Sequence, residues 1–503
     1  MPQYNNKDAD RQVVPRWRTL SDAKLFGELT PLSVHRKNRF HKKWMSDVLA
    51  DWKRQPSVSV ASEVCASAIT LGHPELAHDA AEYVIANPMS TNAAQDIAQR
   101  CLLSINEPAQ GFTELHSSIG LLQQAKSRIR TCRERLRQYP HNPILWVNLA
   151  LAYTIVGHDQ KSKRAIEVAL SMSPKSRFVV RSASRFFLHE GDPERAENVL
   201  TKACAGANSD PWILASQLAV ACSQKKSSQL FSVARRLLDT DRFSPFHLSE
   251  LASALSTMEA KAGNLKRSRT LCRRSIKEPA ENAIAQAAWL DRQFHGMSLG
   301  SSPLHAVSAE AEAWTNHQAG SWGQALQDAK TWQDQQPFSS RPAILAGYIS
   351  STIFEDYKES VRILERARPS NSNDALLHNN LAFAQIELLN LKEAASLLAR
   401  AARMPQTTST KICLAATKGL LNYRSGAFLS GRQEYRKAMM LAKANDQIEL
   451  FNRAMVYFAM EETRIQSEEA SEFWTEGIAA AQLVSGPMSS VLIGRLNEQR
   501  ERS

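Results

Sequence analysis

Residues 143–157, PILWVNLALAYTIVG, determine the expected fold of this chain. Trp146, Leu149 and Tyr153 recur at spacings of three and seven residues, which places them on one face of an α-helix. Gly157 follows with the permissive backbone that commonly ends a helix. The next apolar-periodic stretch, SKRAIEVALSMS, reads as a second helix. The two stretches therefore predict a helix hairpin.

This hairpin repeats with a period of 34 residues. Residues 143–174 align with residues 177–208, and one further step from Val180 reaches Leu214, so the period is seen in three units. Self-similarity at such a period is typical of solenoids built from one supersecondary unit. The aligned pairs are Trp146 with Val180, Leu149 with Ala183, Tyr153 with Phe187, Gly157 with Gly191, Ile166 with Leu200, and Ala169 with Ala203.

The unit resembles the tetratricopeptide repeat, through Trp146, Leu149, Tyr153, Gly157, Ala169 and Pro174. Weaker copies occupy residues 58–88, 245–279, 306–337, 375–405 and 412–440. The resemblance implies an all-α fold, a right-handed superhelical α-solenoid of helix-turn-helix repeats. It also implies a function in holding a partner, because arrays of this kind are rarely catalytic.

The repeats divide the chain into five predicted regions. Residues 290–305 interrupt the pattern with Gly, Ser and Pro and are predicted to form a hinge or loop. The full division is a basic N-terminal arm at 1–56, a first array at 57–289, the hinge at 290–305, a second array at 306–445, and C-terminal capping helices at 446–503.

Composition indicates a folded protein with a basic surface. The 503 residues include 62 Lys and Arg against 50 Asp and Glu, a net charge of +12, which favours an acidic protein surface or a nucleic acid as partner. Seven widely spaced cysteines without a C-x-x-C pair favour a reducing compartment. With no long apolar run in the sequence, we expect a cytoplasmic protein that does not enter a membrane.

Motifs that carry chemistry are missing from the sequence. No G-x-x-x-x-G-K-[ST], G-x-G-x-x-G, H-E-x-x-H or G-x-S-x-G pattern occurs. The neighbouring carboxylates Glu461 and Glu462 are expected to belong to a solvated charged face, since adjacent helical residues point in different directions. We therefore predict no catalytic residues, no cofactor and no metal site, and hence no enzyme.

First-helix residues beyond those needed for the core are the candidate partner-binding groove, because first helices line the concave side of such arrays. They combine an apolar part with a basic part, which suits an amphipathic helix or an extended acidic peptide. Packing between repeats is the alternative explanation for Phe178 and Trp212. The predicted groove residues are Val147, Leu151, Thr154, Phe178, Arg181, Arg185 and Trp212.

Arginine clusters form the second candidate site. Arg is suited to bidentate contacts with carboxylate or phosphate, so the clusters fit an acidic protein surface or a nucleic-acid backbone. A third basic run, residues 35–44, lies in the arm. The predicted basic patch contains Arg128, Arg130, Arg133, Arg135, Arg137, Arg267 and Arg274.

The sequence thus predicts a non-catalytic scaffold or adaptor. It would bind a partner protein or peptide in its concave groove, and that partner could be an effector enzyme that the array regulates. The alternative is a nucleic-acid-binding solenoid that uses the Arg and Lys clusters. Self-association through apolar ends of the array is a further alternative for the partner.

Overall fold

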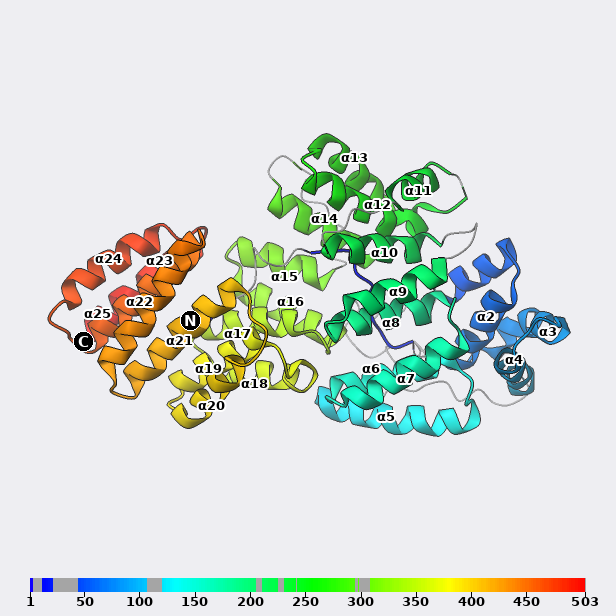
Figure 1. The fold of residues 1–503 in the computed structure, drawn as a ribbon, viewed down its shortest axis with the longest axis horizontal. Coiled ribbons are helices and arrows are strands. Elements are labelled where there is room, and N and C mark those ends of the chain that lie inside the picture. The colour runs from blue at the N-terminus through cyan, green and yellow to red at the C-terminus, as the bar shows by residue number, and fades with distance from the viewer. Residues whose placement is uncertain are drawn as a thin grey trace. The chain divides into compact units, whose positions relative to one another are not determined.

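The computed structural model describes residues 1–2, 11–20, 44–105, 120–204, 210–224, 230–240, 242–294, 297 and 308–502. Within these ranges the secondary structure is helical, and no β-strand occurs among them (Figure 1). The chain has the helix-hairpin repeat fold predicted from its periodicity. It forms two compact units: unit 1 contains Met1–Ala9 and Ala309–Ser503, and unit 2 contains Asp10–Ser308.

Unit 2 is a succession of hairpins, and from α6 to α12 each first helix contacts the next first helix and its own second helix. A helix at residues 44–54 precedes them. The elements that follow are α2 (Val58–Leu71), η2 (Pro74–Ala77), α3 (His78–Ala86), α4 (Asn92–Ser104), α5 (Leu121–Gln138), α6 (Pro143–Ile155), α7 (Asp159–Met172), α8 (Arg177–His189), α9 (Pro193–Cys204), α10 (Pro211–Ser223), α11 (Leu230–Leu238), α12 (Pro245–Lys261), α13 (Leu265–Ser275) and α14 (Glu281–Gln293).

The period of 34 residues is confirmed and extends to a fourth helix. The first helices α6, α8, α10 and α12 begin at positions 143, 177, 211 and 245. A short polar side chain precedes each start and accepts hydrogen bonds from the free backbone N–H groups of the first turn. Three of the four starts carry proline at the first helical position, where its missing N–H is not needed. These caps are Asn142, Ser176, Asp210 and Ser244.

Glycine at positive φ closes the hairpins of unit 2. Gly157 has φ 77°, and the next residue donates from its backbone N–H back to the carbonyl of Tyr153 at 2.9 Å. Gly191 and Gly263 adopt the same conformation. Ser162, at a position where the repeat family usually has alanine, donates to the carbonyl oxygen of Ala150 on the first helix at 2.9 Å. The hairpin is therefore fixed by both its turn and its helix crossing.

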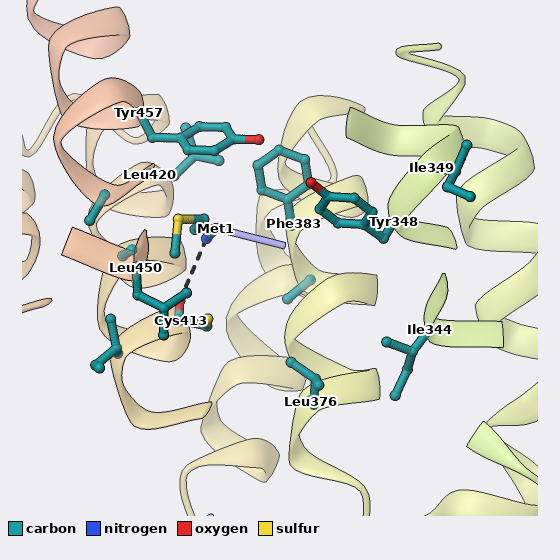
Figure 2. Packing of buried hydrophobic residues seen from close by; sticks show 14 of the residues in the cluster. Met1, Ile344, Tyr348, Ile349, Leu376, Phe383, Cys413, Leu420, Leu450 and Tyr457 are labelled. Carbon is teal, nitrogen blue, oxygen red and sulfur yellow. Dashed lines mark hydrogen bonds between the residues drawn. The ribbon is translucent and has the colours of Figure 1, made fainter. Parts of the chain in front are cut away.

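Unit 1 continues the same pattern with eleven helices and a short 3-10 turn in the described residues. Its aromatic core joins Tyr348, Phe383 and Tyr457, with the side chain of Met1 buried beside them (Figure 2). The elements are α15 (Ala309–Gln318), α16 (Trp322–Gln335), α17 (Ser340–Thr352), α18 (Tyr357–Ala367), η4 (Pro369–Asn371), α19 (Ala375–Glu387), α20 (Leu391–Ala401), α21 (Thr408–Arg424), α22 (Phe428–Ala444), α23 (Ile448–Arg464), α24 (Ala470–Gln482) and α25 (Met488–Arg502).

Two local expectations differ from the structure. Helix α14 runs to Gln293, four residues into the predicted hinge, and most of the remaining hinge lies outside the described residues. The prediction of a solvated face at Glu461 and Glu462 is wrong, because both side chains are buried. Each is paired with an arginine of α21 or α22, Arg424 and Arg432 respectively, and this pairing makes the burial tolerable.

Candidate partner-binding site

The first helices of unit 2 are covered on both sides. Eleven of the thirteen residues in α6, and likewise in α10, are buried, whereas only four of the fourteen residues in the second helix α7 are. A helix packed on one side only would bury a single face. We call the side of α6, α8, α10, α12 and α14 that faces away from the second helices the inner face of unit 2. A further part of the chain must cover this face.

An N-terminal segment, residues 11–20, provides part of this cover. Amide side chains of the first helices hold its main chain. The amide of Asn148 on α6 accepts from the backbone N–H of Leu20 at 3.1 Å and donates to its carbonyl at 2.7 Å. On α14, Asn282 donates to the carbonyl of Val14 at 2.9 Å. The segment, which has no helical residue, is therefore bound through its backbone as an extended peptide would be.

The side chains of the segment are held as specifically as its backbone. Arg11 donates to Gln286 at 2.5 Å and to Asn282 at 2.9 Å. Arg16 pairs with Glu281 at 2.8 Å, and Arg18 pairs with the other oxygen of the same carboxylate. Between these two arginines lies Trp17. We call residues 11–20 the N-terminal strap.

Trp17 is the apolar anchor of the strap. Its side chain is fully buried, and its ring meets the ring of Phe186 on α8 edge to face, with centroids 5.8 Å apart. Aromatic pairs in this arrangement stabilise beyond their area of burial. The strap therefore combines backbone pairing, ion pairing and one buried aromatic, which are the three elements of a specific peptide site.

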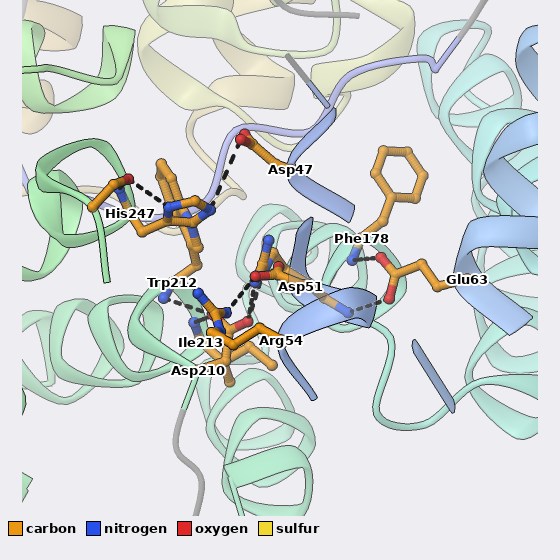
Figure 3. Close-up of polar contacts among 11 residues, drawn as sticks. Asp47, Asp51, Arg54, Glu63, Phe178, Asp210, Trp212, Ile213 and His247 are labelled. Carbon is orange, nitrogen blue, oxygen red and sulfur yellow. Dashed lines mark hydrogen bonds and ion pairs between the residues drawn. The ribbon is translucent and has the colours of Figure 1, made fainter. Parts of the chain in front are cut away.

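The helix at residues 44–54 covers another part of the inner face (Figure 3). The ring of Trp44 meets that of Phe178 with centroids 5.5 Å apart. Asp51 pairs with Arg177 at 2.5 Å, and Asp47 lies 3.9 Å from the imidazole of His247. An ion pair thus connects this helix to α8, and a polar contact connects it to α12.

Arg177 is the centre of a buried charge cluster. Besides Asp51 it pairs with Asp210, the cap of α10, at 2.5 Å. Arg177 holds the pKa of Asp210 below its ordinary value against the opposing effect of burial, which is the largest single influence on that carboxyl. Burial lowers the pKa of the nearby His247, and the positive charge of Arg177 lowers it further. The cluster therefore keeps an imidazole neutral beside two carboxylates.

Glu63 on α2 completes this cluster at the start of α8. Its carboxylate accepts from the backbone N–H groups of Arg177 at 3.2 Å and Phe178 at 3.3 Å. Burial nevertheless raises its pKa to about 7, with the positive charge of Arg177 opposing the shift. Glu63 is thus poised to change its charge near neutral pH.

The structure brings the predicted groove residues together on α6, α8 and α10 but leaves most of them covered. Val147, Leu151 and Thr154 are buried, and Thr154 exchanges a hydrogen bond of 2.6 Å with Ser162 on the second helix. Phe178 and Trp212 are buried as well, which fits the packing alternative. They are therefore not exposed in this conformation.

The two predicted arginines of the groove are half-buried. Arg181 pairs with Glu250 at 2.6 Å and lies over the ring of Trp212, with 4.9 Å to its centroid. Arg185 is partly covered and also engaged by neighbours. The sequence did not predict the residues that hold the strap, which are Asn148, Glu281, Asn282 and Gln286. Asn148 gave the one usable signal, an amide within an otherwise apolar helix.

The predicted basic patch divides into exposed and engaged members. Arg130, Arg133 and Arg137 are exposed on α5. Their successive spacings of three and four residues place them on one helical face. Arg135 donates to the carbonyl of Ile69 at 2.9 Å, and Arg128 is half-buried. On α13, Arg267 and Arg274 are exposed, and Arg274 lies 3.5 Å from Asp239.

These clusters do not form one patch. Figure 1 shows α5 and α13 on opposite sides of unit 2. Of the third basic run, residues 35–43 lie outside the described residues. The net positive charge nevertheless belongs to this unit. Residues 10–308 carry 40 Lys and Arg against 27 Asp and Glu, a net charge of +13, whereas the rest of the chain carries 22 against 23, a net charge of −1.

The described residues hold no group of three or more His, Cys, Asp and Glu side chains arranged to bind a metal ion. Among the helices of the same ranges, none is long and apolar enough to cross a membrane.

Comparison with known proteins gives similarity of fold only. No family model matches the sequence, and no curated protein matches it. Solved structures of repeat proteins align over much of the chain. The Cut9–Hcn1 hetero-tetramer of the APC/C is 12% identical, covers 94% of this chain and 98% of its own, and has a TM-score of 0.41. Human IFIT1 with m7Gppp-AAAA is 13% identical, covers 73% and 96%, and has a TM-score of 0.36. Yeast Tom70 is 12% identical, covers 76% and 96%, and has a TM-score of 0.30.

Proposed function

We propose that this chain is a non-catalytic scaffold that binds a segment of a partner protein on its first helices, with regulation of an effector as the outcome of that binding. One observation carries the proposal. Asn148 pairs with both main-chain groups of Leu20, so the inner face of unit 2 has side chains placed to hold an extended polypeptide. A surface built only for repeat packing has no need of such pairing.

Affinity purification at moderate salt, with and without nuclease, tests this function. The expected result is a stoichiometric protein that stays bound after nuclease treatment and is lost when Asn148 is replaced by alanine. Gln160→Ala is a matched control, because Gln160 is an exposed amide on the neighbouring second helix α7. A partner that is retained equally by both variants would show that the inner face is not its binding site.

Nucleic-acid binding is the second candidate function, favoured by one observation. Arg130, Arg133 and Arg137 are exposed along one face of α5, and the unit that contains them has a net charge of +13. Phosphate contacts make affinity fall steeply with salt. Charge reversal of the three arginines to glutamate should then abolish binding to a fluorescent oligonucleotide. Binding that is insensitive to salt and to this reversal would exclude this face.

A further inference from the structure

The N-terminal strap is bound to unit 2 in the manner of a ligand rather than of a repeat. Residues 11–20 contain no helical residue, whereas the described parts of the repeats are built from helices. Their backbone groups pair with side chains of α6 and α14, which lie more than 120 residues away in the sequence. The contact thus joins an extended segment to a surface made by helices of the repeats.

The recognising residues define a chemistry. Glu281 presents both carboxylate oxygens, one to Arg16 and one to Arg18, and these two arginines flank a single residue. That residue, Trp17, enters the fully buried position against Phe186. An arginine–aromatic–arginine triplet in an extended conformation satisfies all of these contacts at once.

A second basic position lies upstream of the triplet. The guanidinium of Arg11 is paired with two amide oxygens, those of Gln286 and Asn282, while Gln286 donates at 2.8 Å to the carbonyl of Arg11 itself. Arg11 is therefore recognised through both its side chain and its main chain. The five-residue distance from Arg11 to Arg16 fixes the register of the bound segment.

We propose that the inner face of unit 2 is a site for an extended peptide that carries an arginine–aromatic–arginine triplet, and that the N-terminal strap is its tethered competitor. This inference rests on the proposed scaffold function and names the chemistry of the partner segment. It replaces the acidic peptide expected from sequence with a basic one, because the carboxylate that faces the ligand, Glu281, belongs to the array. A partner segment binds by displacing the strap.

Tethering sets the expected competition. Because the strap belongs to the same chain as its site, it acts at an effective concentration on the order of millimolar. A free copy of the segment must therefore bind the wild-type chain much more weakly than a chain whose own strap no longer fits. The difference between the two affinities measures the competition directly.

The test uses the full chain and a fluorescein-labelled peptide that copies residues 9–22, ADRQVVPRWRTLSD. In the released variant, Arg16, Trp17 and Arg18 are all replaced by alanine. Fluorescence anisotropy should show that the released variant binds the peptide, and that the wild-type chain binds it at least ~10-fold more weakly. Equal binding by the two chains, or no binding by a released variant whose circular dichroism matches the wild type, would overturn the proposal.

Two controls identify the site. In the released variant, Glu281→Gln should remove peptide binding, whereas Glu278→Gln, an exposed carboxylate three residues earlier, should leave it unchanged. A peptide with alanine in place of its tryptophan should not bind. Peptide binding that survives Glu281→Gln would place the peptide elsewhere and contradict the proposal.

A second measurement covers the case in which the released variant does not fold. A copy of the peptide made with ¹³C,¹⁵N-labelled amino acids, so that its fragments differ in mass from those of residues 11–20, is added to the wild-type chain at millimolar concentration, and deuterium uptake is followed. Residues 11–20 should exchange faster as the peptide displaces them, and unchanged uptake would overturn the proposal. A partner that binds the scaffold but is not displaced by the peptide would leave the scaffold function standing and sink this inference alone.

Discussion

The two units cover their first helices in different ways. In unit 2 the cover combines a buried anchor, Trp17, with many polar contacts. Asn148, Glu281 and Asn282 hold the N-terminal strap, and Asp51 brings the helix at residues 44–54 onto Arg177. In unit 1 the described cover is Met1 and Pro2, whose carbonyl groups accept from Asn379 and Arg453 at 2.9 Å while an apolar side chain enters the core. Met1 lies within the aromatic core, and the hydroxyl of Tyr348 contacts the sulfur of Met488 on α25 at 3.6 Å.

This difference separates a ligand-like contact from a structural one. The polar contacts of an extended segment such as the strap can be replaced by those of another extended segment, since the incoming backbone forms the same hydrogen bonds. Buried aromatic packing is lost outright when it opens, because water replaces no part of it. We therefore expect unit 2 to open at its cover and unit 1 to resist opening.

Removing the buried arginine from each unit should give the largest effects. Arg177 bridges Asp51 and Asp210, and Arg424 bridges Glu387 and Glu461. Replacing either by alanine removes the arginine shared by two carboxylates and should cost about 3–5 kcal/mol. Chemical denaturation followed by hydrogen exchange should detect the loss in unit 2 for Arg177→Ala and in unit 1 for Arg424→Ala. Arg130→Ala, at an exposed position, serves as the control.

The two substitutions test the comparison because Arg177 pairs with a residue of the cover, whereas Arg424 pairs with residues of the first helices. Asp51 belongs to the covering helix, whereas Glu387 and Glu461 lie on the first helices α19 and α23. Arg177→Ala should therefore expose residues 44–54 before the repeats of unit 2 unfold. Simultaneous opening of the cover and the repeats would show that the cover is part of the core.

Trp17→Ala should have a smaller and local effect. The lost burial is worth on the order of 2–3 kcal/mol, and it acts on the strap because the rest of unit 2 already forms its own hairpins. Deuterium uptake should rise at residues 11–20 and stay constant in α19–α25. A fall in the unfolding midpoint of unit 1 in this variant would mean that the strap is not a local addition.

Each unit should show its own pH dependence of stability, caused by one buried glutamate. Glu63 has a folded-state pKa of about 7, above its ordinary value of 4.5, so between these values the folded state holds the extra proton. Stability then falls as pH rises from 4.5 to 7. Glu63→Gln should remove this fall in unit 2. Glu461, with its pKa also raised by burial to about 7, causes a separate fall in unit 1.

Melting curves at several pH values measure the change in stability, and hydrogen exchange at the same pH values shows in which unit it occurs. If Glu63→Gln leaves the pH dependence of unit 2 unchanged, Glu63 is already ionised throughout this range. Glu278→Gln, at an exposed position, provides the matched control.

The smallest expected effect concerns the turns. Unit 2 uses Gly72, Gly157, Gly191 and Gly263 at positive φ. Unit 1 also uses glycine, at Gly320 and Gly426, but places Leu389 at φ 62° in an equivalent turn. A branched residue is unfavourable in this conformation. Leu389→Gly should raise stability by about 1 kcal/mol, and Gly263→Ala should lower it by a similar amount. Thermal unfolding checks both signs.

The sequence predicted the repeats better than it predicted the site. Helix periodicity from Trp146 to Tyr153 and the glycine at 157 are local signals, so the hairpin and its 34-residue period could be read directly. The cover could not, because it joins Leu20 to Asn148 and Arg16 to Glu281 across long separations in sequence. Residues such as Val147 and Leu151 were correctly placed on the first helices, but a helix pattern does not say that another segment lies on top of it.

Burial of charge was the other property that local pattern could not show. Glu461 and Glu462 have the composition of a solvated face, and only the arginines of α21 and α22 make their burial stable. The partner residues lie 37 and 30 positions away, Arg424 and Arg432 respectively. Such pairs follow from the stacking of repeats rather than from any single helix.

Photo-crosslinking from position 17 is the most direct test of the central claim, that the strap occupies the inner face of its own unit 2. Trp17 is replaced by p-benzoylphenylalanine in the full chain, which is then irradiated and digested. The account predicts a link within one chain to the peptide that contains Phe186, since the two rings are in contact. A link to a second chain, or no link to α8, would contradict it.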